Sequence, residues 1–129
     1  MSIANIAALV LEVLLGLFSA YAAYTLFMWT PPSITKARDA LRYPRWWWIL
    51  AGVMATLGAL GLFVGLFIPV VGVVAILWMI AYFVVAAGSH LVRSDVTGFT
   101  IPLLFTAFFV GLLVLRWSDA TPVLALVGL

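Results

Sequence analysis

The chain has 129 residues, of which 67% are hydrophobic and 8% are charged, and its formal net charge is +2. A soluble domain has about 25% charged residues, so this composition excludes an ordinary soluble fold and indicates a protein embedded in lipid. Cysteine is absent, which excludes disulfides, thiolate nucleophiles and cysteine-ligated metal centres.

Four apolar stretches are each long enough to cross a bilayer, which takes about 20 residues of helix. They lie at 3–29, 46–67, 69–88 and 99–117. A membrane β-barrel would show short alternating segments, whereas these runs are continuously apolar. We therefore predict an all-α integral membrane four-helix bundle that forms one domain over residues 1–129, with a short interfacial segment between helices 1 and 2. The first stretch is too long for a cleavable signal and has no Lys or Arg before its apolar core.

The first stretch contains Glu12, the one acidic residue within an apolar run. It shares a four-residue spacing with Ala8, Gly16 and Ala20. Small residues favour helix–helix contact in lipid, so we expect Glu12 to face the bundle. Counted from Ile3, Glu12 lies about 13 Å along the helix, close to the middle of the membrane. An ionised carboxylate is costly there unless it is paired.

No cation is expected at the depth of Glu12, because Arg116 would have to turn its side chain inward to reach it. The neutral candidates for a hydrogen bond are Thr56, Thr106 and Trp78, so we expect Glu12 to be largely protonated. Two roles stay open. Glu12 is either a functional proton acceptor or headgroup ligand, or a structural hydrogen bond or subunit contact.

The segment from Ser33 to Arg45 contains half of the charged residues. Ile34, Ala37 and Leu41 recur in it at helical spacing, which predicts a short amphipathic helix at the headgroups. A solvated loop is the alternative. This segment and the link at 93–98 together carry five cations, and the other side of the membrane has only Arg116. We therefore expect cytoplasmic charged loops and two outward-facing termini, with the tail after Trp117 along the interface.

Two further residue types recur along the apolar stretches. Tryptophans at the ends of the stretches are typical of anchors at a membrane interface; they are Trp29, Trp46, Trp47, Trp48 and Trp117. Small residues within the stretches predict close helix packing and little central cavity. The small residues are Gly16, Ala51, Ala55, Ala59, Gly61 and Gly65.

Few side chains suggest a specific chemistry. His90 is the only histidine, so it cannot supply both axial ligands of a haem or a His-rich metal site, and we expect an interfacial hydrogen bond instead. Tyr21, Tyr24, Trp78 and His90 are candidate contacts for a headgroup or a quinone, with helix packing as the alternative for the tyrosines. We predict no catalytic residue, no metal site and no intrinsic cofactor, and a self-sufficient enzyme is not expected.

The segment from Ala51 to Leu62 resembles the Gly-rich second helix of the DoxX-like family of small four-helix bacterial membrane proteins. The similar layout extends from Leu11 to Trp117. Members often have a glutamate where this chain has Ala55, and a lysine late in the first helix, near Thr25. The resemblance implies a bacterial cytoplasmic membrane and a setting beside other membrane proteins. Some relatives are linked to quinone-dependent sulfur oxidation.

Three functions are compatible with these features. The leading one is a non-catalytic integral membrane subunit that packs against or stabilises a larger complex, with redox and energy-converting complexes as candidates. The first alternative is a quinone-linked component of a DoxX-type oxidoreductase, with Glu12, Tyr21 or Tyr24 near the headgroup and every electron carrier in a partner. The second alternative is a small oligomeric transporter or lipid-handling protein. The expected partners are membrane lipids and other membrane subunits, with no nucleic acid.

Overall fold

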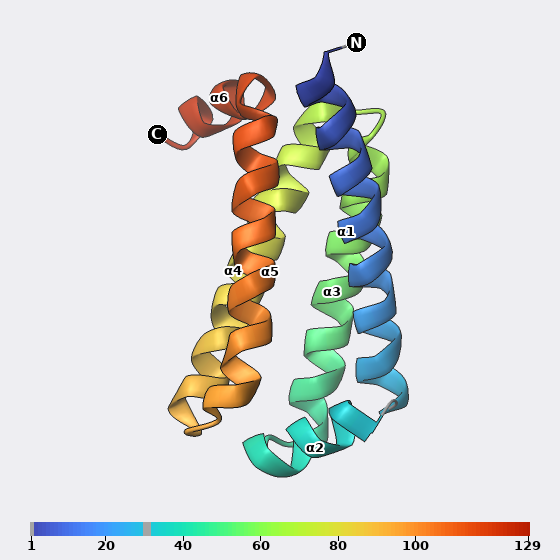
Figure 1. Cartoon of the computed structure of the whole chain (residues 1–129), viewed down its shortest axis with the longest axis vertical. Coiled ribbons are helices and arrows are strands. Elements are labelled where there is room, and N and C mark those ends of the chain that lie inside the picture. Colours follow the sequence, from blue (N-terminus) through green and yellow to red (C-terminus); the bar gives the residue numbers. More distant parts are fainter. Residues whose placement is uncertain (1, 30–31) are drawn as a thin grey trace.

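The computed structural model describes residues 2–29 and 32–129, and this part of the chain contains helices and no strands (Figure 1). Four helices are long and apolar enough to span a membrane, as predicted. They are α1 (Ile3–Met28), α3 (Arg45–Gly65), α4 (Pro69–Val92) and α5 (Val96–Leu115). Two shorter helices, α2 (Pro32–Leu41) and α6 (Trp117–Leu126), complete the fold.

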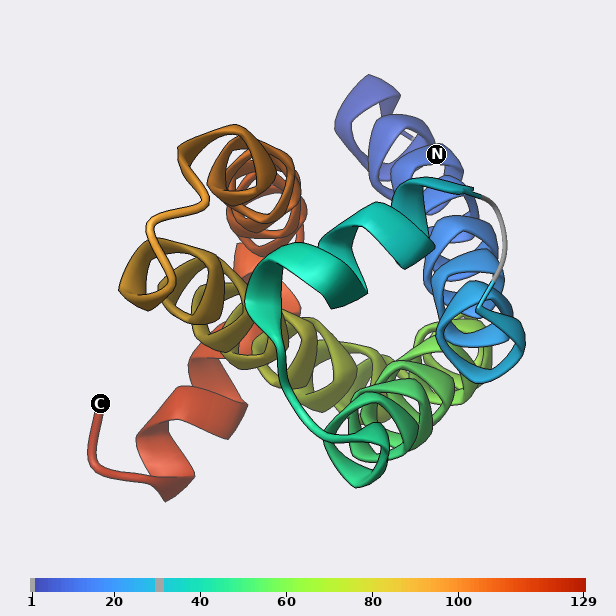
Figure 2. The ribbon, with the colours of Figure 1, turned by 90° about the horizontal axis from the view of Figure 1, so that it is seen from below.

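The spanning helices follow one another around the bundle. α1 packs against α3, α3 against α4 and α4 against α5, while fewer contacts join α1 to α5. Both termini lie at the end of the bundle where α3 turns into α4 (Figure 1). α2 crosses the opposite end, where α1 stops and α3 begins (Figure 2). An even number of crossings therefore brings the two charged connections, α2 and the α4–α5 link, to one end.

The two short helices dock their apolar residues on the bundle. Ile34, Ala37 and Leu41 of α2 pack in a cluster with Leu26 and Trp48, so the predicted amphipathic helix forms and the loop alternative does not. At the other end, the buried residues of α6 pack on Val73 of α4. α6 thus holds the segment after Trp117 close to the bundle end.

Close helix contact at the α3–α4 turn depends on glycine. A Cβ on Gly65 would overlap the Cα of Gly72, and a Cβ on Gly61 would lie 2.8 Å from the Cβ of Ala75. Of the predicted packing stripe Ala51, Ala55 and Ala59 on α3, the last two are buried and Ala51 is half-buried. Gly16 fits beneath the ring of Phe63 in the same way, with 3.0 Å between its added Cβ and the ring.

The predicted stripe on α1 is correct only in part. Ala8, Glu12 and Gly16 are buried, but Ala20 is exposed and Ser19 and Ala23 are buried instead. Four residues turn a helix by about 400°, so a four-residue stripe drifts about 40° at each step. After three steps the stripe has left the buried face.

Candidate functional site

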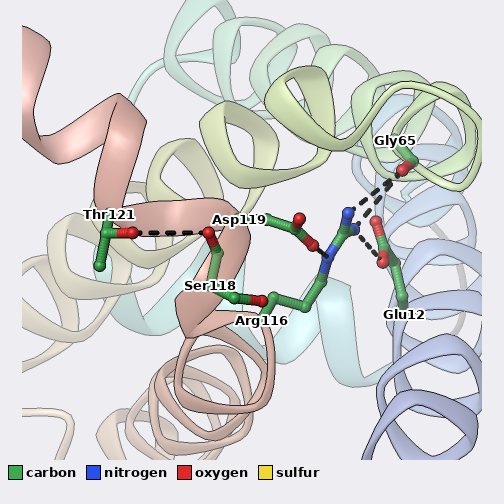
Figure 3. Close-up of polar contacts among 6 residues, drawn as sticks. All are labelled: Glu12, Gly65, Arg116, Ser118, Asp119 and Thr121. Carbon is green, nitrogen blue, oxygen red and sulfur yellow. Dashed lines mark hydrogen bonds and ion pairs between the residues drawn. The ribbon is translucent and has the colours of Figure 1, made fainter.

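Arg116, at the C-terminal end of α5, turns its side chain into the bundle and forms an ion pair with Glu12 (Figure 3). Its guanidinium also donates to the carbonyl oxygen of Gly65, at 3.5 Å, and to Asp119 Oδ2, at 3.4 Å. The expectation of a neutral partner for Glu12 is therefore wrong. We call these three side chains and the Gly65 carbonyl the ionic cluster.

Glu12 lies level with the end of α3 and the start of α4, and not with the middle of the bundle. A Cβ on Gly65 or on Gly72 would lie 3.0 Å from Glu12 Oε1, so the carboxylate contacts the end of α3 and the start of α4. The expected mid-membrane position is wrong because α1 begins more than two turns before this level. The neutral candidates Thr56, Thr106 and Trp78 donate instead to the carbonyls of Gly52, Pro102 and Met54.

Burial makes the ionic cluster a strong structural link. Glu12 is 1% exposed and Arg116 is 8% exposed, whereas the side chain of Asp119 is 40% exposed. Glu12 Oε1 has no hydrogen-bond partner within the part of the chain described here. A buried pair resists the loss of either partner, because the remaining charge is left uncompensated. The cluster thereby joins α1, the end of α3, the end of α5 and the first turn of α6.

A cavity of about 400 Å³ lies at the opposite end of the bundle, between α3 and α4 and against α2. We call it the α2 cavity. Its wall is largely apolar and includes Leu26, Leu41, Trp47, Met54, Trp78 and Tyr82, with Ser89 and His90 at one end. The sequence predicted little central cavity, and the α2 cavity lies to the side of the bundle, where α3 and α4 no longer approach through glycine.

The candidate headgroup contacts from the sequence fall into separate places. Trp78 and His90 line the α2 cavity. Tyr21 and Tyr24 are each 55% exposed on the outer face of α1, and Glu12 belongs to the ionic cluster. Two of the five candidates thus line the same cavity, at its opposite ends, and the other three lie elsewhere.

His90 forms the interfacial hydrogen bond expected of it. Its Nδ1 lies 2.8 Å from Asp95 Oδ2 in the α4–α5 link. Asp95 also caps α5 by accepting from the backbone N–H of Gly98, at 3.1 Å. The hydrogen bond from His90 is the main reason that the pKa of Asp95 lies below its ordinary value, with further contributions from Gly98 and the charge of Lys36. The link is therefore anchored to the end of α4 beside the α2 cavity.

The predicted interface anchors differ in their surroundings. Trp46 and Trp117 are exposed, as an anchor requires, whereas Trp48 is 5% exposed and donates to the carbonyl of Tyr43, at 3.2 Å. The Trp48 prediction is therefore wrong. Trp47 lines the α2 cavity. Two guanidinium groups stack on the ring of Trp29. The ring centre lies 4.5 Å from Cζ of Arg38 and 4.1 Å from Cζ of Arg45.

Arg45 has a role that sequence reasoning missed. It donates to the carbonyls of Leu26 and Phe27, at 3.2 and 2.6 Å, at the C-terminal end of α1. Helix ends leave such carbonyls without partners, and a cation there also complements the helix dipole. The sequence signal for this role was an arginine that follows a helix break and precedes an apolar run.

Among the described residues, no group of three or more His, Cys, Asp or Glu side chains could hold a metal ion.

The fold and the apolar helices define a small four-helix integral membrane protein. The chain belongs to the DoxX-like family, whose sequence model matches residues 10–112. This confirms the resemblance seen from Leu11 to Trp117. Comparisons with curated proteins and with solved structures found no match. Ala55 and Thr25 are both buried.

Proposed function

We propose that this DoxX-like protein is a non-catalytic membrane subunit that packs through α5 against another membrane protein. The observation that supports the proposal is the poor coverage of α5 by the rest of the chain. Of its 20 residues only Pro102, Phe109 and Leu112 are buried, although the helix is apolar along its whole length. An apolar helix with so few fully buried residues has a large surface left for lipid or for another helix.

Small residues on this surface favour a helix as the neighbour. Ala107 and Gly111 are exposed and four residues apart, and a Cβ on Gly111 would meet no atom within 4 Å. Such spacing lets a second backbone approach closely and gain van der Waals contact that lipid chains do not supply. The ion pair of Glu12 with Arg116 weighs against a transporter, because the one acid within the spanning helices is already engaged.

Site-specific cross-linking in the native membrane tests this proposal. The chain has no cysteine, so Gly111→Cys introduces a single thiol on α5. Leu14→Cys is the matched control, on the exposed face of α1. We expect Gly111→Cys to give one defined adduct with another membrane protein, in fixed ratio by mass spectrometry, and Leu14→Cys to give none. Recovery of the chain alone with both variants would contradict the proposal.

A quinone-linked redox component is the second candidate, and the α2 cavity favours it. The apolar wall suits an isoprenoid tail, and Ser89 and His90 at one end offer polar atoms for a headgroup. Tyr21, Tyr24 and Glu12 lie elsewhere and would not contribute. The quinone would supply the redox chemistry, and the chain would bind and orient it. A stoichiometric quinone in a lipid extract of the purified protein would support this candidate.

A further inference from the structure

The α2 cavity has the shape of a groove that opens sideways between two helices. It follows α4 from Trp78 to His90, a rise of about 18 Å. Leu50 of α3 and Val85 of α4 line it and are themselves exposed, so the groove is open toward the surrounding lipid.

Both ends of the groove are closed by specific contacts. At the inner end the Trp78 indole donates to the Met54 carbonyl, at 3.0 Å, and so ties α4 to α3. At the other end the apolar face of α2 covers it with Ile34, Ala37 and Leu41. A long apolar slot with one lateral opening fits a hydrocarbon chain that enters from the bilayer.

The α2 end of the groove is strongly cationic. Five cations lie at this end of the bundle, in α2, in the link that follows it, at the start of α3 and just after α4, against the carboxylates of Asp39 and Asp95. Arg93 lies 4.7 Å above the ring of Tyr43, whose hydroxyl donates to the Ser89 carbonyl at 3.4 Å. The Arg93 charge is thereby held beside the residues that end the groove.

Three of these cations, Lys36, Arg42 and Arg93, form no ion pair and no hydrogen bond to a helix end among the described residues. Arg45 is engaged with the end of α1, and Arg38 stacks on Trp29 and pairs with Asp39 at 3.3 Å. Lys36 is exposed on α2 and precedes Ala37, which lines the groove. Asp95 is bound to His90, which lines the polar end of the groove. Lys36 and Arg93 therefore flank the polar end of the groove from α2 and from α4.

We propose that the α2 cavity binds one acyl chain of an anionic phospholipid, with the lipid phosphate held between Lys36 and Arg93. The apolar slot takes the chain, and the cationic end takes the headgroup at the depth where an amphipathic helix such as α2 lies. A quinone has no charge for these cations to bind, so the charge around the mouth favours the phospholipid. The site is independent of the α5 surface and does not rest on the proposed subunit role.

Native mass spectrometry of the purified chain tests the proposal directly. The protein in mild detergent is mixed with equal amounts of dioleoyl phosphatidylglycerol and dioleoyl phosphatidylcholine, which differ in mass. We expect one retained lipid per chain and a preference of about 25-fold for phosphatidylglycerol, since each basic residue near an anionic lipid contributes roughly fivefold. Lys36→Gln with Arg93→Gln should abolish this preference, and Arg38→Gln should leave it unchanged.

Two matched alanine-to-phenylalanine variants distinguish lipid bound in the groove from lipid bound elsewhere on the protein. Ala81→Phe fills the wall of the cavity, and Ala107→Phe makes the same change on exposed α5. We expect only Ala81→Phe to lower lipid retention. Equal retention of both lipids by the unaltered protein, or unchanged retention by Ala81→Phe, would overturn the proposal. So would a quinone in place of the phospholipid in protein purified from its native membrane.

Discussion

Replacing Glu12 by Gln should destabilise the bundle by about 3–5 kcal/mol, the usual cost of removing one partner of a buried ion pair. Glu12 is 1% exposed and faces Arg116, which is 8% exposed. After the change, Arg116 keeps the Gly65 carbonyl and Asp119, each at 3.4–3.5 Å. Long hydrogen bonds of this kind do not compensate a buried guanidinium, so most of the loss should appear in the free energy of unfolding.

A double-mutant cycle assigns this loss to the pair. Arg116→Met should cost as much as Glu12→Gln, because it leaves the carboxylate buried without a cation. Glu12→Gln combined with Arg116→Met should cost clearly less than the sum of the two single changes, since both charges are then gone. Asp119→Asn is the matched control. The Asp119 side chain is 40% exposed, so its removal should cost about 0–1 kcal/mol.

Equilibrium unfolding in mixed micelles, driven by a denaturing detergent and followed by tryptophan fluorescence, measures these free energies. Trp117 adjoins Arg116 in the chain and is one of the six tryptophans that contribute to the signal. A cost below about 1 kcal/mol for Glu12→Gln, or strictly additive effects of the two changes, would refute the reasoning. A Glu12→Gln protein that folds, assembles and keeps every associated activity would exclude a role for Glu12 as a proton acceptor.

Three further outcomes follow from the packing and the charges. Gly65→Ala should cost about 1–3 kcal/mol in the same unfolding assay because its Cβ would overlap the α4 backbone, whereas Gly111→Ala should be neutral to about 0.5 kcal/mol. Asp95→Asn should remove a stabilisation that is complete above about pH 4 and is lost as the pH falls through the lowered pKa of Asp95. Melting curves of the variant and the parent should therefore converge at acid pH, and parallel curves would contradict this. Trp78→Phe should cost about 1 kcal/mol through the lost hydrogen bond to an α3 carbonyl, and an unchanged midpoint would show that this bond contributes nothing.

The elements of the fold were predictable because they depend on local properties of the sequence. The length of an apolar run decides whether a helix can span the bilayer, and all four runs become helices. The spacing of Ile34, Ala37 and Leu41 likewise predicted the helix that crosses the bundle end. Ala55 and Ala59 were placed correctly on the packed face because the helical period needs no knowledge of the partner.

The candidate site was less predictable because it depends on contacts between distant segments. Arg116 ends an apolar run, and this position predicts a residue at the membrane interface. Only the direction of its side chain, which the sequence does not give, brings it to Glu12. Consecutive side chains point about 100° apart around the helix axis, so three adjacent tryptophans cannot all point out of the bundle. Trp46 is exposed and Trp48 is buried for this reason. α3 and α4 diverge at the end of the bundle where the α2 cavity opens. No periodic pattern in the sequence predicts this divergence.

The ionic cluster also has a consequence for synthesis. Glu12 and its cation are 104 positions apart, so at about 5–20 residues per second α1 waits roughly 5–20 s for Arg116. The contact that joins α1 to the end of α5 therefore forms only after all four spanning helices have been synthesised. A nascent chain that stopped just before Arg116 would contain these four helices and still lack the partner of the Glu12 carboxylate.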